Sequence, residues 1–261
     1  MCFDLNSHPP ITPIAGGALD AERVVLTAED GNRFLAFRAR AAEPTGAGIV
    51  ILPDVRGLHP YYEELALRFA EEGVDALAID YFGRTAGIDT PRDGSFEYRP
   101  HVDATTSDGL RTDIRAAVAE IRAHDAGRVR SAFTIGFCFG GQTAFATPTF
   151  GLDLAGAIGF YGPPHRPRPN GMPAPIDLAP EMVGAVLGIF GGADQGIPPD
   201  AVAAFDEALT AAGVEHKLIT YPDAPHSFFD RKAAEFADAS ASAWDEVLQF
   251  VRGRTAAARQ D

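Results

Sequence analysis

The sequence is poor in cysteine and in basic residues, and it has no long apolar run. Its 261 residues include two cysteines, Cys2 and Cys138, which are too few for a disulfide framework and cannot by themselves complete a structural zinc site. No stretch approaches the roughly 20 apolar residues that span a membrane. The 22 basic residues face 36 acidic ones, for a formal charge of -14. Such a surface repels phosphate backbones and anionic lipid, which argues against nucleic-acid or membrane partners.

The remaining composition is that of an ordinary globular protein, with 46% apolar and 22% charged residues. The first residues have neither a basic start nor the apolar run of a signal peptide, so we expect a cytoplasmic protein. No polar linker divides the chain. We therefore expect a single domain with its core at about 20–253 and an N-terminal extension at 1–19.

Short apolar, β-branched runs alternate with longer segments of helical period. The expected strands are 23–28, 33–38, 47–52, 74–79, 131–136, 155–160, 185–190 and 217–221. Several are continuously apolar, as strands buried on both faces of a parallel sheet are. The first two lie only a few residues apart, which indicates an antiparallel hairpin at the sheet edge.

The expected helices are 60–72, 107–125, 140–147, 200–212 and 232–253. Alternation of strand and helix from residue 47 onward predicts an α/β fold with a mostly parallel sheet and helices on both faces. Two stretches, 85–106 and 162–180, have no clear period, and the second contains seven prolines. They are either surface loops or binding loops that close over a site.

The segment 134–142 lies where a buried strand ends and a helix begins, and it centres on Cys138. A Gly-x-nucleophile-x-Gly pattern at such a junction is the nucleophile elbow of α/β-hydrolases, here with cysteine as the nucleophile. Gly136 and Gly140 would allow the strained turn, and the N–H of Phe139 would donate to an oxyanion. The alternative is a buried apolar cysteine beside packing glycines.

A nucleophile needs a base, and the base needs an acid to orient it. Among seven histidines, only His226 lies in a loop just after a late strand, and Asp194 directly follows the strand at 185–190. The order Cys138, Asp194, His226 is the nucleophile–acid–base order of the α/β-hydrolase fold. Asp223 is a weaker alternative for the acid.

Four strings give the chain a resemblance to the dienelactone hydrolases (carboxymethylenebutenolidases) from about residue 20 to 252, namely 51–57, 136–141, 191–194 and 226–228. The resemblance implies an α/β-hydrolase in which Cys138 attacks the carbonyl of a lactone or ester, His226 shuttles the proton and Asp194 orients the imidazole. It places the oxyanion hole on the N–H groups of Phe139 and Val55. It implies no cofactor and no metal.

The chain departs from this family in its charged positions. The family gates its thiol with a glutamate in the loop after the strand at 47–52, and the matching residue here is Asp54. The family prototype binds its substrate's carboxylate with two arginines. Arg84 matches the first, but the second falls on Asp230, with Arg231 one place later. The dienelactone is therefore one candidate substrate among several.

These features predict a hydrolase that opens a lactone or a small carboxylic ester by acyl transfer to Cys138. One alternative is a general short-chain esterase or thioesterase that uses the same triad. Another is a catalytically silent protein of the hydrolase fold that binds a small molecule. The expected partner is in each case a small molecule, and both a monomer and a homodimer are compatible with the sequence.

Overall fold

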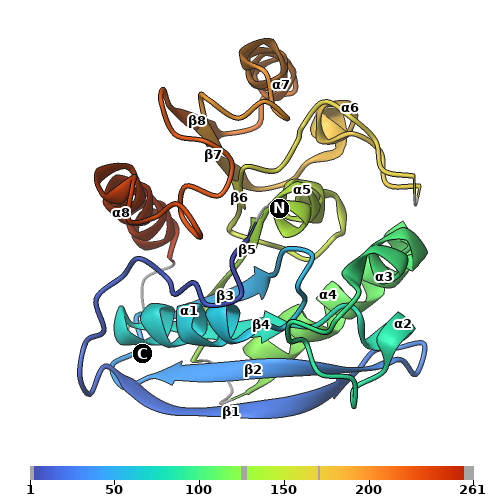
Figure 1. The fold of residues 1–261 in the computed structure, drawn as a ribbon, viewed down its shortest axis with the longest axis vertical. Helices are drawn as coiled ribbons and strands as arrows, with labels where there is room; N and C mark the ends of the chain where they lie inside the picture. The colour runs from blue at the N-terminus through green and yellow to red at the C-terminus, as the bar shows by residue number, and fades with distance from the viewer. Residues whose placement is uncertain (1–2, 125–127, 170, 256–261) are drawn as a thin grey trace.

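The computed structural model describes residues 3–124, 128–169 and 171–255, so Cys2 lies outside the described residues. This part of the chain forms an eight-stranded sheet in the order β1-β2-β4-β3-β5-β6-β7-β8 (Figure 1). The strands are β1 (Ala18–Thr27), β2 (Arg33–Ala41), β3 (Ala47–Leu52), β4 (Val74–Ile79), β5 (Ser131–Phe137), β6 (Gly156–Phe160), β7 (Ala185–Gly191) and β8 (His216–Tyr221).

The predicted hairpin at the sheet edge is confirmed: β1 and β2 pair antiparallel, with Val24 opposite Ala36. β2 also runs antiparallel to β4, and the pairs from β4 through β3 and β5 to β8 are parallel. The parallel strands β3, β4, β5, β6 and β7 are buried along their whole length. Their carboxyl ends therefore meet at one edge of the sheet, where ligand sites form in open α/β folds.

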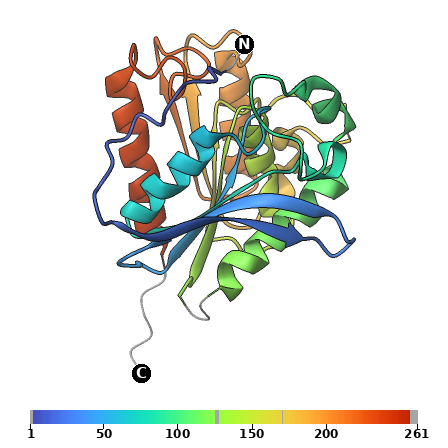
Figure 2. The ribbon, with the colours of Figure 1, turned by 60° about the horizontal axis from the view of Figure 1, so that its bottom comes forward.

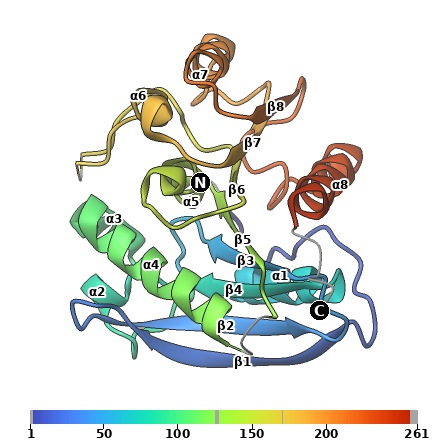
Figure 3. The ribbon, with the colours of Figure 1, turned by 180° about the vertical axis from the view of Figure 1, so that it is seen from behind.

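The long helices cover both faces of the sheet. They are α1 (Pro60–Glu71), α4 (Ser107–Ala123), α5 (Phe139–Ala146), α7 (Pro199–Ala211) and α8 (Ala237–Arg254). α1 and α8 lie together on one face, where the rings of Phe69 and Trp244 are 4.7 Å apart, and α4 covers the other face (Figure 2). Seen from behind, α4 crosses in front of the sheet with α5 beside it (Figure 3). The predicted α/β fold is thus observed.

The last helix is shorter than predicted at its start. Successive turns occupy residues 227–236, with the N–H of Ala233 bound to the Asp230 carbonyl and that of Glu235 to the Lys232 carbonyl. Phe228, Phe229 and Asp230 are buried in these turns, and Ser227 takes a left-handed φ of 63°. The helix therefore begins only at Ala237.

The two stretches without period are partly ordered by short helices. The first holds the end of α2 (Gly83–Ala86) and all of α3 (Tyr98–Ala104). The second holds α6 (Pro175–Leu178), followed by a single 3-10 turn at Ala179–Glu181. In the ranges that the structure describes, no helix combines the length and the apolar character needed to cross a membrane.

Candidate active site

Cys138 stands at the turn between β5 and α5 with φ 54° and ψ -109°, a conformation that non-glycine residues rarely adopt. The glycines around it have no room for a side chain. A Cβ on Gly136 would lie 2.0 Å from the carbonyl oxygen of Gly140, and one on Gly140 would lie 2.0 Å from that of Leu52. The backbone therefore forms the strained elbow that the sequence pattern predicts, and the half-buried thiol is the residue at its apex.

His226 and Asp194 are hydrogen-bonded to each other at the same edge of the sheet. The Nδ1 atom of His226 lies 2.6 Å from Oδ2 of Asp194. Asp194 is buried, and its Oδ1 accepts a second bond of 2.8 Å from the N–H of Gly196. The exposed Asp223 is not the residue paired with His226. Because Asp194 follows β7 and His226 follows β8, both project from the edge that carries the elbow.

The ring of Tyr161, at the end of β6, lies against His226 with the ring centroids 4.8 Å apart. Tyr161 also has a left-handed φ of 38°. Burial raises the pKa of its phenol well above the usual value, so it stays protonated. The imidazole thus contacts a carboxylate at Nδ1 and the tilted ring of Tyr161.

Phe139 is the first residue of α5, and the N–H groups of a first helical turn have no partner within the helix. The N–H of Phe139 is therefore available to an oxyanion beside Cys138. The chain at Leu52 and Pro53 packs directly against Gly140, which brings the following loop, with Val55, beside the start of α5. The two predicted oxyanion donors thus come from adjacent backbone segments.

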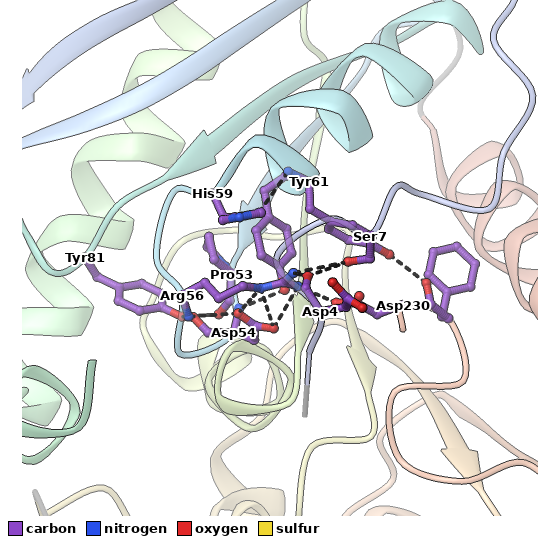
Figure 4. A network of polar contacts seen from close by, with 11 residues as sticks. Asp4, Ser7, Pro53, Asp54, Arg56, His59, Tyr61, Tyr81 and Asp230 are labelled. Carbon is purple, nitrogen blue, oxygen red and sulfur yellow. Dashed lines mark hydrogen bonds and ion pairs between the residues drawn. The ribbon is translucent and has the colours of Figure 1, made fainter. Parts of the chain in front are cut away.

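Asp54 takes part in a buried network, drawn in Figure 4. Both of its carboxylate oxygens accept from Nε of Arg56, at 3.0 and 3.1 Å, and one accepts from the N–H of Arg56 at 2.8 Å. The Asp54 N–H donates to the hydroxyl of Tyr62 at 3.0 Å. The carboxylate that is predicted to gate the thiol is thus bound by the guanidinium of Arg56.

The same guanidinium joins two distant segments to this loop. It forms a short ion pair with Asp230 and donates to the carbonyl of Asp4 at 2.8 Å and to Oγ of Ser7 at 3.3 Å (Figure 4). Asp230 is buried, and burial raises its pKa to about 6 despite the opposing effect of Arg56. Where the family prototype has its second arginine, this chain therefore has Asp230, whose carboxylate binds Arg56 of the loop after β3.

Arg84 does not have the environment of a substrate-binding arginine. It forms a bidentate pair with the buried Asp113, at 2.8 and 2.8 Å, and a second with Asp30 at 2.6 and 3.1 Å. These bonds tie α2 to α4 and to the β1–β2 turn. The expectation that Arg84 binds a substrate carboxylate does not fit this geometry, because two protein carboxylates already occupy its guanidinium.

Sequence reasoning missed Arg168, which comes from the proline-rich stretch and contacts the elbow. Its guanidinium carbon lies 3.8 Å from the centroid of the Phe139 ring, and its Nε donates to Oε1 of Gln142 at 2.7 Å. The only signal in the sequence was its place in an irregular stretch. Over the described ranges, no group of three or more His, Cys, Asp or Glu side chains is arranged to hold a metal ion.

The comparisons with known proteins agree with this geometry. Residues 36–254 match the model of the "Dienelactone hydrolase family". A Synechocystis protein named "Putative carboxymethylenebutenolidase" is 31% identical over 85% of this chain and 93% of its own, and a protein of the same name from Escherichia coli K12 is 25% identical over 85% and 83%. A crystal structure of a dienelactone hydrolase-like promiscuous phosphotriesterase from metagenomic libraries has the same fold, with a TM-score of 0.75 and 22% identity over 92% of this chain and 100% of that one. The chain therefore belongs to the dienelactone hydrolase family.

Proposed function

We propose that this protein hydrolyses a lactone or a small carboxylic ester through a covalent acyl-enzyme on Cys138. The observation that supports this most is the pairing of His226 with Asp194 at the sheet edge that carries the strained Cys138. A positioned nucleophile, base and orienting acid are the requirements of acyl transfer. A protein that only binds a small molecule needs none of these three.

In the proposed reaction, the sulfur of Cys138 attacks the carbonyl carbon, and Nε2 of His226 holds the thiol proton. The negative oxygen of the tetrahedral intermediate accepts from the N–H groups of Phe139 and Val55. As the intermediate collapses, the C–O bond breaks and His226 gives its proton to the departing alkoxide. Water, deprotonated by His226, then attacks the thioester and releases the acid and the thiol. With a lactone, the alcohol and the acid are parts of one product.

The two positions that match the carboxylate-binding arginines of the family prototype do not favour a substrate carboxylate here. Arg84 is paired with two protein carboxylates, and the second arginine of the family prototype is replaced by Asp230. We therefore propose that uncharged esters and lactones are better substrates than the dienelactone carboxylate. The second candidate function is accordingly that of a general short-chain esterase.

The test is hydrolysis of p-nitrophenyl acetate, p-nitrophenyl butyrate and a dienelactone by the wild type, Cys138→Ala and Cys2→Ser. We expect Cys138→Ala to lose activity and Cys2→Ser, the matched cysteine control, to keep it. Preference for the neutral nitrophenyl esters would favour the short-chain esterase, and preference for the dienelactone would favour the lactonase. Equal inactivity of wild type and Cys138→Ala on the whole panel would refute the hydrolase and favour the silent binder.

A further inference from the structure

Arg168 is a cation that contacts the elbow through neutral partners. Besides the bond from its Nε to Gln142, its Nη1 donates to Oγ1 of Thr143 at 3.0 Å and its Nη2 donates to the carbonyl of Phe139 through a short hydrogen bond. Gln142 in turn donates to the carbonyl of Arg166 at 2.7 Å, which clamps the loop to α5. Within the described ranges, none of the ion pairs to a carboxylate involves Arg168.

A partly buried cation among neutral acceptors is costly, because its desolvation is not repaid by an opposite charge. Burial lowers the pKa of Arg168 to about 10, so the guanidinium stays charged near neutral pH. Two anions would oppose this decrease, ionised Tyr81 and ionised Cys138. Burial raises the pKa of Tyr81 well above its usual value, so Tyr81 stays neutral. The geometry agrees, because the hydrogen bond to the carbonyl of Phe139 and the contact with its ring place the guanidinium against the residue that follows Cys138, where its charge favours a thiolate.

We propose that Arg168 is a positioning residue of the site, which holds the first turn of α5 through the Phe139 carbonyl and stabilises the thiolate of Cys138 by its charge. The inference deepens the proposed function, since it assumes that Cys138 is the nucleophile. Attraction between two charges acts equally on both partners, so a thiolate that keeps Arg168 protonated is itself favoured by Arg168.

Of the other charged groups described around the elbow, His226 also becomes positive in the proposed reaction, when it takes the thiol proton. Asp54 and Asp230 share Arg56, so that cluster carries no surplus positive charge. His226, after β8, is paired with the negative Asp194 of the β7 loop. Tyr161 and Tyr81, at the ends of β6 and β4, are neutral. Because Arg168 is charged whether or not His226 holds the thiol proton, it favours the thiolate throughout the reaction.

The experiment measures how fast iodoacetamide alkylates Cys138 as a function of pH. It uses a Cys2→Ser background, so that Cys138 is the one thiol that can be alkylated. The thiolate displaces iodide, so the rate follows the thiolate fraction. We expect Arg168→Met to move the midpoint upward by at least about one pH unit, which slows alkylation about tenfold below the wild-type midpoint. Arg168→Lys should restore part of the shift. Arg111→Met, which removes an arginine stacked on Phe150 at 5.0 Å, is the matched control and should leave the midpoint unchanged.

A second variant changes the charge beside Arg168 without removing the arginine. Gln142→Glu keeps the acceptor for Nε of Arg168 and pairs the guanidinium with a carboxylate, although it gives up the bond to the Arg166 carbonyl, and the midpoint should rise. If both variants kept the wild-type midpoint, the electrostatic role of Arg168 would be refuted. A KM increase confined to the dienelactone, without a change of midpoint, would instead make Arg168 a substrate-binding residue. Alkylation needs no substrate turnover, so a shifted midpoint in a protein that hydrolyses no ester would support this inference and refute the proposed function.

Discussion

Asp230 offers a quantitative test of the buried network that replaces the expected gate. Burial raises the pKa of this carboxyl from its ordinary 3.8 to about 6. Between roughly pH 4 and pH 6 the folded protein therefore holds a proton on Asp230 that the unfolded chain has already released. Stability contributed by this proton is fully present at low pH, decreases as the pH rises and is gone above pH 6.

The size of the effect follows from the same two values. Their difference, at roughly 1.4 kcal/mol per pH unit, corresponds to about 3 kcal/mol of unfolding free energy. An Asp230→Asn variant is neutral at every pH and still presents an oxygen to Arg56. We expect it to match the wild type near pH 4 and to exceed its stability by up to about 3 kcal/mol at pH 7.

The assay is urea unfolding of both proteins at several pH values between 4 and 7, with Asp223→Asn as the control for an exposed aspartate of the same loop. The control should follow the wild type across the whole range. If Asp230→Asn instead became progressively less stable than the wild type as the pH rose, the ion pair with Arg56 would outweigh the cost of burying the Asp230 carboxylate.

Three further predictions concern Asp194, Tyr62 and Arg84. Asp194→Asn should reduce the ester hydrolysis rate about 10³–10⁴-fold, because His226 loses the carboxylate that sets its tautomer, and steady-state kinetics measures this. Tyr62→Phe should cost about 1–3 kcal/mol in urea unfolding, since a buried main-chain N–H loses its acceptor. Arg84→Met should destabilise the fold by about 2–3 kcal/mol by leaving the buried Asp113 without its cation. The same variant should leave the ratio of kcat/KM for anionic and neutral substrates unchanged. A loss of kcat/KM confined to the anionic substrate would show that Arg84 binds the substrate.

The sheet could be predicted largely from the sequence because burial on both faces makes each central strand continuously apolar. β3 and β4 begin and end at the predicted residues. β1 begins at Ala18 rather than at 23, since its first residues lie at an exposed edge and carry no apolar pattern. α3 was not predicted because it is a short helix without a buried residue, so no apolar stripe marks it.

The candidate triad could be located from the sequence because each of its residues directly follows a strand whose end lies at one edge of the sheet. The networks around Asp54 and Arg84 could not, because they join segments far apart in the chain. Asp54 binds Arg56, two residues away, but that guanidinium also binds Asp230 and the N-terminal segment at Asp4. Arg168 reaches the elbow only through the path of an irregular loop, which carries no periodic signal.

If Cys138 carries the acyl group, the acyl-enzyme can be trapped on its sulfur. The protein is mixed briefly with p-nitrophenyl acetate, quenched with acid and mapped by peptide mass spectrometry. We expect one acetyl group on the peptide that contains Cys138, formed together with a burst of nitrophenol, and no such group in Cys138→Ala. Acetylation of a different residue, or undiminished hydrolysis by Cys138→Ala, would show that Cys138 is not the nucleophile.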